Sequence, residues 1–420
     1  MAVSARATVV PGRVHELREA LAGMADGGEG APSIPFSRLG GVHFARLVLL
    51  EDDVDQDGNT IAANLVYMSE VDAPLDDRLD ELADLGGAGL DATFGLCEGY
   101  PAAPDSSSRA AFLRDHSLPP RASYVNTIGR TVDQIRDEAR LRDAIEDFLD
   151  AARAAGELSD EPSKIRAAIQ DFVRGEPSLR WATGRAPRPS LGWRAGELLH
   201  AIAGPVTALL AAPLLLPALL VWIPLLRLHE LRDRPHHVLP DPDHVRRLAA
   251  LEDLAAHNPF TAVGFVKPGL LRRVTVEVVL RLIDFAARHL FTRANLAGIK
   301  TIHFAHWIVL DDYRRVIFTS YYDGSLESYM DDFIDKVAFG LNAAFSNGVG
   351  YPRTRFLLFD GAKREEEFKA FLRRQQIPTH VWYSAYPQLT ARNIENNALI
   401  RSGLSGKLTP RETEAWLRRL

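Results

Sequence analysis

Cysteine is almost absent from this chain, and its scarcity excludes two kinds of structure. The 420 residues include one cysteine, Cys97, so neither an intramolecular disulfide nor a metal site built from several cysteines can form. A single thiol is typical of a protein from a reducing compartment. The N-terminal residues MAVSARATVV also lack the basic region and apolar core of a secretory signal, so we expect no such signal.

A strong charge of one sign is missing as well. The net charge is −6 at pH 7 with acidic and basic residues mixed along the chain, which argues against a nucleic-acid partner. The motifs G-x-S-x-G, H-E-x-x-H, the Walker loop and the dinucleotide-binding G-x-G-x-x-G are absent, which argues against the common hydrolases, zinc proteases and nucleotide-binding enzymes. The content of 46% hydrophobic and 25% charged residues is that of a folded protein.

The chain contains one pattern in two copies. Residues 69–101 align without a gap with residues 320–352. The aligned pairs include Asp72 with Asp323, Leu75 with Leu326, Phe94 with Phe345 and Pro101 with Pro352, and shortly before them His43-Phe44-Ala45 corresponds to His303-Phe304-Ala305. Self-similarity over this length indicates an internal repeat.

Each copy predicts the order strand, helix, strand, strand, helix, strand, which is the ferredoxin-like pattern. The strand containing His303 is apolar on both faces, so one face can pack on helices and the other needs a second sheet. The other copy can supply that sheet. We therefore predict an α+β fold of two tandem ferredoxin-like repeats. The expected elements of the second copy are strands at 262–266, at His303, at Val316, at 356–359 and at 380–386, with helices at 270–290, from Leu326 and at 365–374.

Over residues 5–150 and 260–402 the chain resembles the dimeric α+β barrel proteins in their fused, two-repeat form. Within that superfamily it is similar to the dye-decolourising peroxidases, which bind haem in the C-terminal half and have a distal aspartate in a GxxDG motif. The matching residues are Ser320-Tyr321-Tyr322-Asp323-Gly324, with serine in place of the first glycine. The resemblance implies a fused dimeric α+β barrel, haem as the cofactor and a peroxidase-like oxidoreductase activity.

Candidate site residues lie mostly in the second copy. We predict His303, Asp323 and Arg353 as catalytic residues, and His306, His380, Tyr383, Arg392 and Asn393 as cofactor-binding residues. A haem ligand can be a single histidine, and arginines can hold a propionate. The twins His43 and Asp72 leave open a scaffold role for His303 and a turn role for Asp323. No metal-ion site is predicted, and the His236-His237 pair is interpreted as part of a loop.

A long segment from Leu198 to Leu226 has no Asp, Glu, Lys or Arg and is long enough to cross a bilayer. One crossing would place the two copies on opposite sides, where they could not share a barrel. Its four prolines and the basic residues on both sides instead predict a hairpin that enters and leaves at the cytoplasmic face. A buried, proline-kinked hairpin is the alternative. The flanking basic residues are Arg185, Arg188, Arg194, Arg227, Arg232 and Arg234.

These patterns predict a membrane-associated oxidoreductase that acts on a hydrophobic small molecule, with membrane lipid as a partner and a homo-oligomer left open. A non-catalytic lipid-binding or scaffold protein and a cofactor-independent monooxygenase are the alternatives. The predicted segments are a first repeat at 1–130, a helical connector and linker at 131–194, a membrane hairpin at 195–231, a juxtamembrane linker at 232–258, a second repeat at 259–402 and a C-terminal helix at 403–420.

Overall fold

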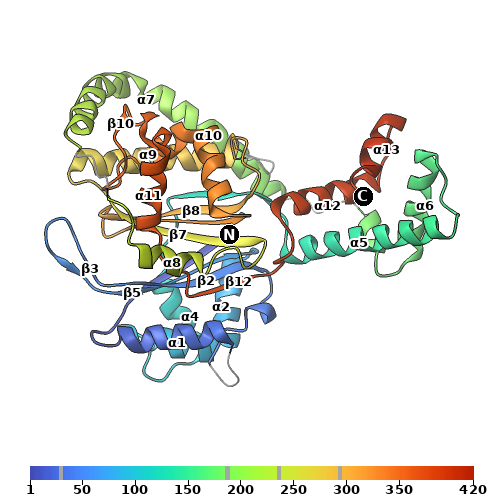
Figure 1. The fold of residues 1–420 in the computed structure, drawn as a ribbon, viewed down its shortest axis with the longest axis horizontal. Helices are drawn as coiled ribbons and strands as arrows, with labels where there is room; N and C mark the ends of the chain where they lie inside the picture. Colours follow the sequence, from blue (N-terminus) through green and yellow to red (C-terminus); the bar gives the residue numbers. More distant parts are fainter. Residues whose placement is uncertain (28–31, 185–189, 234–237, 292–295) are drawn as a thin grey trace. The chain divides into compact units, whose positions relative to one another are not determined.

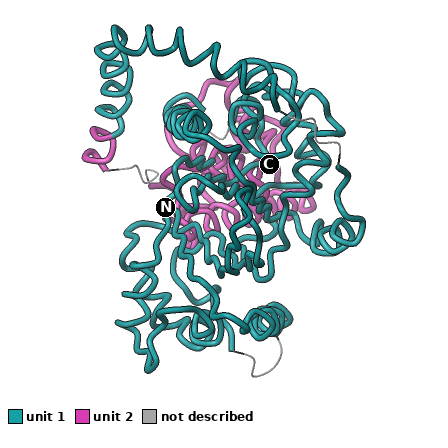
Figure 2. Tube along the Cα trace, turned by 90° about the vertical axis from the view of Figure 1, so that its left-hand side faces the viewer, with its two compact units in different colours: residues 1–126, 197–388 teal, residues 127–196, 389–420 magenta. Residues whose placement is uncertain are grey.

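The computed structural model describes residues 1–27, 32–184, 190–233, 238–291 and 296–420. The chain divides into two compact units (Figure 2). Unit 1 contains residues 1–126 and 197–388, and unit 2 contains residues 127–196 and 389–420. The predicted second repeat is divided between the units, because residues 389–402 belong to unit 2. The His236-His237 pair and the arginines Arg185, Arg188 and Arg234 lie outside the described residues.

Unit 1 is mixed α+β, as predicted, and contains two antiparallel four-stranded sheets. The first sheet has the strand order β1-β5-β2-β12, and the second has the order β6-β8-β9-β7. The strands of the first sheet are β1 (Ala2–Thr8), β2 (Val42–Leu50), β5 (Asn64–Val71) and β12 (Val381–Ser384). Those of the second are β6 (Ala122–Val125), β7 (His257–Phe265), β8 (Ile302–Leu310) and β9 (Arg315–Asp323).

Each sheet takes one edge strand from the other half of the chain. β12 pairs with β2, with Trp382 opposite Arg46, and β6 pairs with β8, with Ser123 opposite His306. Arg46 and His306 occupy equivalent positions in the two copies, so the exchange is the same in both directions. Strand exchange of this kind ties the two halves of the sequence into one body.

The predicted closed barrel is wrong for the described part of the chain, where the strands remain in two separate sheets. The exchanged edge strands β6 and β12 have only four residues each and hydrogen-bond along one side, to β8 and β2. The sheets instead pack face to face. Their shared apolar layer contains Val48, Leu50, Val66 and Met68 from the first sheet and Ile308, Leu310 and Ile317 from the second.

Helices cover the outer face of each sheet, so unit 1 has four layers (Figure 1). The first sheet is covered by α1 (Val14–Asp26), α2 (Leu75–Leu85), α3 (Gly87–Phe94) and α4 (Ser106–Asp115). The second is covered by α9 (Leu270–His289), α10 (Leu326–Phe345) and α11 (Glu365–Gln375). Burial of their apolar faces holds the layers together, as the helical spacing of Leu326, Met330 and Phe333 predicts.

Short elements connect these layers. They are η1 (Phe36–Arg38), β3 (Asp53–Val54), β4 (Thr60–Ile61), α8 (Pro242–Ala249), β10 (Thr354–Arg355), β11 (Phe359–Asp360) and η3 (Gly361–Lys363). The strand expected at 356–359 is wrong, because Phe356 and Leu357 have positive φ angles of 55° and 59° and form the turn between β10 and β11. Apolar residues in that turn gave the pattern of a strand.

Unit 2 is helical and has its own core. Its helices are α5 (Val132–Ala154), α6 (Pro162–Gly175), η2 (Arg180–Thr183), α12 (Ala391–Gly403) and α13 (Pro410–Leu417). Leu141, Ile145, Ile169, Ile400 and Trp416 are buried together among them. Thr409 and Glu412 form a reciprocal capping box at the start of α13.

The apolar segment is one helix of 42 residues, α7 (Leu191–Arg232), so the predicted hairpin of two helical legs is wrong. Pro205, Pro213, Pro217 and Pro224 all lie inside this helix. Each proline removes a backbone hydrogen bond and bends the helix, and here none of them ends it. The bent helix arches along one side of unit 1 (Figure 1).

Candidate functional site

A buried histidine–aspartate pair lies at the same end of each sheet. His303 Nε2 is 2.7 Å from Asp323 Oδ1, and His43 Nε2 is 3.1 Å from Asp72 Oδ1. In both sheets the pairing register shifts at the histidine, between Val42 and Phe44 and between Ile302 and Phe304. Such a bulge turns two successive side chains to one face. It therefore places each histidine and its following phenylalanine between the sheets.

A further histidine lies beside the second pair. His257, at the start of β7, lies opposite Asp323 in the sheet, and its Nε2 is 3.6 Å from Asp323 Oδ1. His257, His303 and Asp323 are all buried, and their ligating atoms lie within 4.8 Å of one another. In the first sheet His43 Nδ1 is 2.9 Å from the Tyr386 hydroxyl instead. The two pairs thus have different surroundings.

Charged side chains also cross between the sheets, at equivalent positions of the two copies. Arg46 donates to the Phe260 and Ser320 carbonyl oxygens and to the Tyr321 hydroxyl. In the reverse direction, His306 Nε2 is 2.6 Å from Glu70 Oε1. Burial alone would raise the pKa of the Glu70 carboxyl, but the facing His306, the N-terminal amine and Arg46 outweigh it and lower that pKa. These contacts lock one half of unit 1 onto the other.

Two of the predicted cofactor-binding residues lie away from the inter-sheet contacts and line a cavity. His380 and Tyr383 border a cleft of about 560 Å³, together with residues of η1, α8 and the loop before β12. Tyr383 stacks on Phe36 with ring centroids 5.6 Å apart. His380 Nδ1 accepts a hydrogen bond from the Leu49 amide at 3.4 Å. The cleft is therefore separate from the His303–Asp323 pair.

We expect His380 to make unit 1 less stable in mild acid. Burial lowers the pKa of His380 below its usual 6.5, with Glu51 acting to raise that pKa and Arg18 to lower it. As the pH falls below 6.5 the unfolded chain therefore binds the proton first, and the free energy of unfolding decreases until the lower folded pKa is reached. Denaturant unfolding at a series of pH values should show that the free energy of unfolding falls less steeply with decreasing pH in His380→Gln than in the native chain. Equal slopes would contradict this assignment.

The remaining predicted residues lie elsewhere. Arg353 donates to the Asp233 carbonyl oxygen at 2.7 Å, at the C-terminal end of α7. Arg392 and Asn393 belong to α12 of unit 2, where Arg392 is exposed and Asn393 forms the capping box with Thr390. These three side chains therefore have structural partners or exposed positions outside the inter-sheet cluster.

The eight predicted residues do not form a single haem site among the described residues. His303 lines neither the cleft beside His380 nor the cavity under α9 and α10. Its Nε2 faces Asp323, and its ring packs edge-on against Phe44 with the ring centroids 5.3 Å apart. A haem ligand needs an open side for the macrocycle and a free ring nitrogen toward the iron. The His303 ring is buried and packed against Phe44, so it has no open side for a macrocycle, and we derive no step through haem.

Helix α7 is held at both ends by unit 1. At its N-terminal end Arg288 of α9 forms an ion pair with Glu197, and His200 Nδ1 is 2.7 Å from His289 Nε2. At its C-terminal end Asp233 accepts hydrogen bonds from Lys267 and from Arg272 of α9. The helix from Glu197 to Arg232 is about 52 Å long, whereas Arg272 and Arg288 lie about 24 Å apart along α9. The middle of α7 must therefore bow away from α9.

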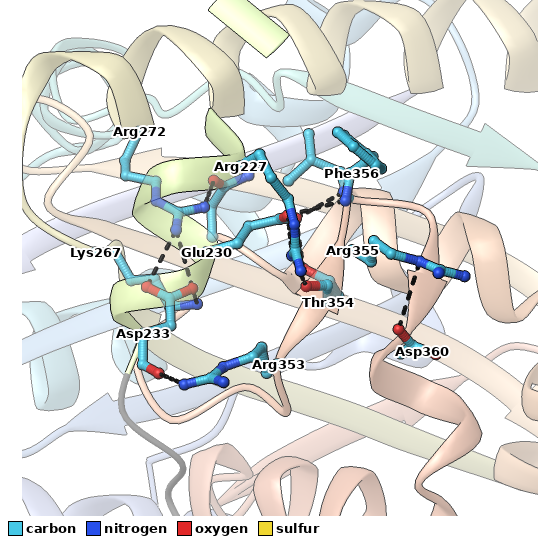
Figure 3. A network of polar contacts seen from close by, with 12 residues as sticks. Arg227, Glu230, Asp233, Lys267, Arg272, Arg353, Thr354, Arg355, Phe356 and Asp360 are labelled. Atoms are coloured by element: carbon cyan, nitrogen blue, oxygen red, sulfur yellow. Dashed lines mark hydrogen bonds and ion pairs between the residues drawn. The ribbon is translucent and has the colours of Figure 1, made fainter. Parts of the chain in front are cut away.

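The C-terminal attachment is a buried polar cluster (Figure 3). The Glu230 carboxylate is fully buried and accepts hydrogen bonds from the Thr354 hydroxyl and from the amides of Phe356 and Leu357, at 2.8–2.9 Å. Arg227 bridges Glu230 and the Thr354 carbonyl oxygen. A buried carboxylate with this many partners is a strong and directional attachment. It joins the end of α7 to the turn between β10 and β11.

The uncharged part of α7, Leu198–Leu226, is named here the apolar arc. Most of its side chains are exposed, including Leu209, Leu210, Leu214 and Leu220, while Leu226 at its C-terminal end is buried. It is the one helix in the described part of the chain that is long and apolar enough to cross a membrane. An exposed apolar surface of this extent marks a membrane or protein contact.

A second cavity lies under α9 and α10, and we name it the apolar pocket. Its volume is about 430 Å³, and it is walled by Trp307 and Phe318 of the second sheet and by Met330 and Phe333 of α10. The turn at 356–358, which Glu230 holds, also lines it. At its border Leu282 and Phe339 expose more than half of their surface. Because its walls are apolar, the pocket suits a hydrocarbon ligand.

The fold and these features define a mixed α+β protein with two facing sheets, a buried histidine–aspartate cluster and an externally bowed apolar helix. No family model, curated protein or solved structure matches the chain.

Sequence reasoning missed three important residues. Glu230 is the first acidic residue after the apolar arc, and this position is the only feature of the sequence that could have drawn attention to it. Glu70 is aligned with Tyr321 in the repeat, and a carboxylate within an apolar strand could have been noticed. For His257 there was no signal, because its partners come from strands far away in the sequence.

Proposed function

We propose that this protein is anchored in one leaflet of a membrane by the apolar arc and binds a hydrocarbon chain in the apolar pocket. The observation that supports the proposal is that both ends of α7 are tied to unit 1. A helix that crossed the bilayer would have its ends on opposite sides. The arc is instead suited to lie within the interfacial region of one leaflet. The arginines Arg194 and Arg232 at its ends favour the cytoplasmic leaflet.

The position of the pocket supports the hydrocarbon ligand. Helix α7 contacts two elements that line the pocket, since Gly204 lies close to the Phe285 ring of α9 and Glu230 binds the turn at 356–358. An acyl chain in the leaflet would therefore lie close to the exposed border of the pocket at Leu282 and Phe339. This is the lipid-binding alternative of the sequence analysis, with a defined pocket.

We propose the ferredoxin-like repeat as the origin of unit 1. The two copies share a bulge at the histidine, a paired aspartate and an exchanged edge strand. Equivalent positions also form the cross-sheet contacts Arg46–Tyr321 and Glu70–His306. Duplication and fusion of one unit explain why these features occur in pairs.

Filling the pocket tests the proposed function. Gly340 of α10 lines the pocket, and a Cβ added there would meet only the Val337 side chain at 3.9 Å, so Gly340→Leu places a side chain in the cavity without a backbone clash. We expect the affinity for the fluorescent fatty acid cis-parinaric acid to fall at least about tenfold, which corresponds to about 1.4 kcal/mol.

The matched control is Gly23→Leu in α1, where an added Cβ meets nothing within 4 Å. This variant is expected to bind the fatty acid as the native chain does. Equal binding by both variants, or no binding by the native chain, would contradict the ligand proposal.

An oxidoreductase acting on the same hydrocarbon ligand is a second candidate, favoured by the buried cluster of His257, His303 and Asp323. A visible absorption spectrum tests its haem-dependent form. A Soret band that develops on adding hemin would support haem binding and would contradict the geometric argument against a haem site at His303. A spectrum without that band would exclude it.

A further inference from the structure

Three neighbouring strands of the second sheet bring their ends together at one point between the sheets. β7 begins at His257, β9 ends at Asp323, and β8 has its bulge at His303. Asp323 Oδ1 is 2.7 Å from His303 Nε2 and 3.6 Å from His257 Nε2. The aspartate thus lies on the central strand with one histidine on each side.

This donor set suits a divalent transition-metal ion. Two imidazoles and one carboxylate are common ligands of Zn²⁺ and Fe²⁺ in proteins. Metal–ligand bonds of about 2.1 Å at tetrahedral or octahedral angles place neighbouring ligand atoms roughly 3.0–3.4 Å apart. The two observed separations bracket that range, and all three ligand atoms lie within 4.8 Å of one another, so a metal ion fits between the three groups once the side chains move closer together.

A hydrogen bond and an aromatic ring hold the histidines of this cluster in fixed orientations. His257 Nδ1 is 3.0 Å from the Ser384 hydroxyl, which fixes the ring and directs Nε2 toward Asp323. The Phe44 ring packs edge-on against both imidazoles, with centroids 5.3 Å away. A hydrogen bond on the second ring nitrogen and an apolar wall are typical of metal-binding histidines.

The first sheet provides an internal comparison. It has the equivalent pair His43 and Asp72, but there the tyrosine hydroxyl of Tyr386 takes the place of a third ligand. The second pair thus has a histidine nitrogen beside it where the first pair has a tyrosine hydroxyl.

We propose that His257, His303 and Asp323 bind one divalent transition-metal ion. In that state the metal ion replaces the direct hydrogen bond between His303 and Asp323. This inference revises the expectation that the chain has no metal site. It does not depend on the membrane arc or on the apolar pocket.

A titration of chelator-treated protein with Co²⁺ tests the proposal, because Co²⁺ bound by nitrogen and oxygen ligands absorbs visible light and substitutes for Zn²⁺. We expect one Co²⁺ per full-length chain, displaced by Zn²⁺. His257→Ala and His303→Ala should each weaken binding by more than the roughly 100-fold that loss of a supporting residue causes.

His43→Ala is the control, since it removes the equivalent histidine of the other copy, and it should bind Co²⁺ within a few-fold of the native chain. No visible absorption by the native chain at millimolar Co²⁺, or an equal loss in His43→Ala, would overturn the proposal and leave the cluster as a hydrogen-bonded scaffold. The titration of the native chain decides this even where a variant fails to fold.

Discussion

Replacing Leu214 and Leu220 with aspartate is expected to lower the affinity for phospholipid vesicles at least about 100-fold, or about 2.7 kcal/mol. Both leucines lie in the apolar arc and are among its most exposed side chains. A charged residue at the centre of a membrane-spanning helix costs about 2.5–3.5 kcal/mol on insertion scales, and even a smaller cost at the interface, applied twice, would remove the arc from the membrane. Flotation with vesicles measures the bound fraction.

The matched control places the same two charges outside the arc. Leu239 and Leu254 are also highly exposed, so Leu239→Asp with Leu254→Asp changes the net charge equally. This variant is expected to float with vesicles as the native chain does. If the two double variants behaved alike, net charge rather than the arc would determine membrane binding.

Replacing Glu230 with alanine is expected to reduce the free energy of unfolding of unit 1 by about 3 kcal/mol, since removal of one partner from a buried ion pair costs about 3–5 kcal/mol. The change leaves the Phe356 and Leu357 amides without their acceptor and leaves the Arg227 guanidinium with only the Thr354 carbonyl oxygen of its two described acceptors. Denaturant unfolding measures the loss. Amide hydrogen exchange at Phe356 and Leu357 should accelerate as well.

The other end of α7 provides the comparison. Glu197 pairs with Arg288, whose side chain is 43% exposed, so Glu197→Ala is expected to cost less than about 1 kcal/mol. An equal loss in both variants would show that the Glu230 cluster is not the stronger attachment of the arc.

Sequence patterning was sufficient for the elements whose signal is local. The helices from Leu270 and Leu326 and the strand containing His303 follow from the spacing of their apolar residues, and the structure confirms them. The repeat also aligned His303 with His43 and Asp323 with Asp72. In the structure each histidine is hydrogen-bonded to the aspartate of its own copy.

Features that depend on pairing between distant segments could not be predicted in this way. A bulge depends on the register of the neighbouring strand, and the shift between Ile302 and Phe304 places Ile302 on the same face of β8 as Ala305 and Trp307, which simple alternation along the strand does not predict. Prolines predicted a break in α7, but a helix can bend at proline without ending. His257 reaches the cluster only because β7 lies beside β9 in the sheet.

The claim that both ends of the apolar arc lie on one side of the membrane can be measured by thiol labelling. Burial raises the pKa of the Cys97 thiol to about 12, and Cys97→Ser removes it as a target. Single cysteines are then introduced as Gly196→Cys and Arg232→Cys, both at exposed positions flanking the arc. With the protein in sealed vesicles, a membrane-impermeant maleimide should label both from the same side, while Leu214→Cys stays protected. Labelling of Gly196→Cys and Arg232→Cys from opposite sides would contradict the account.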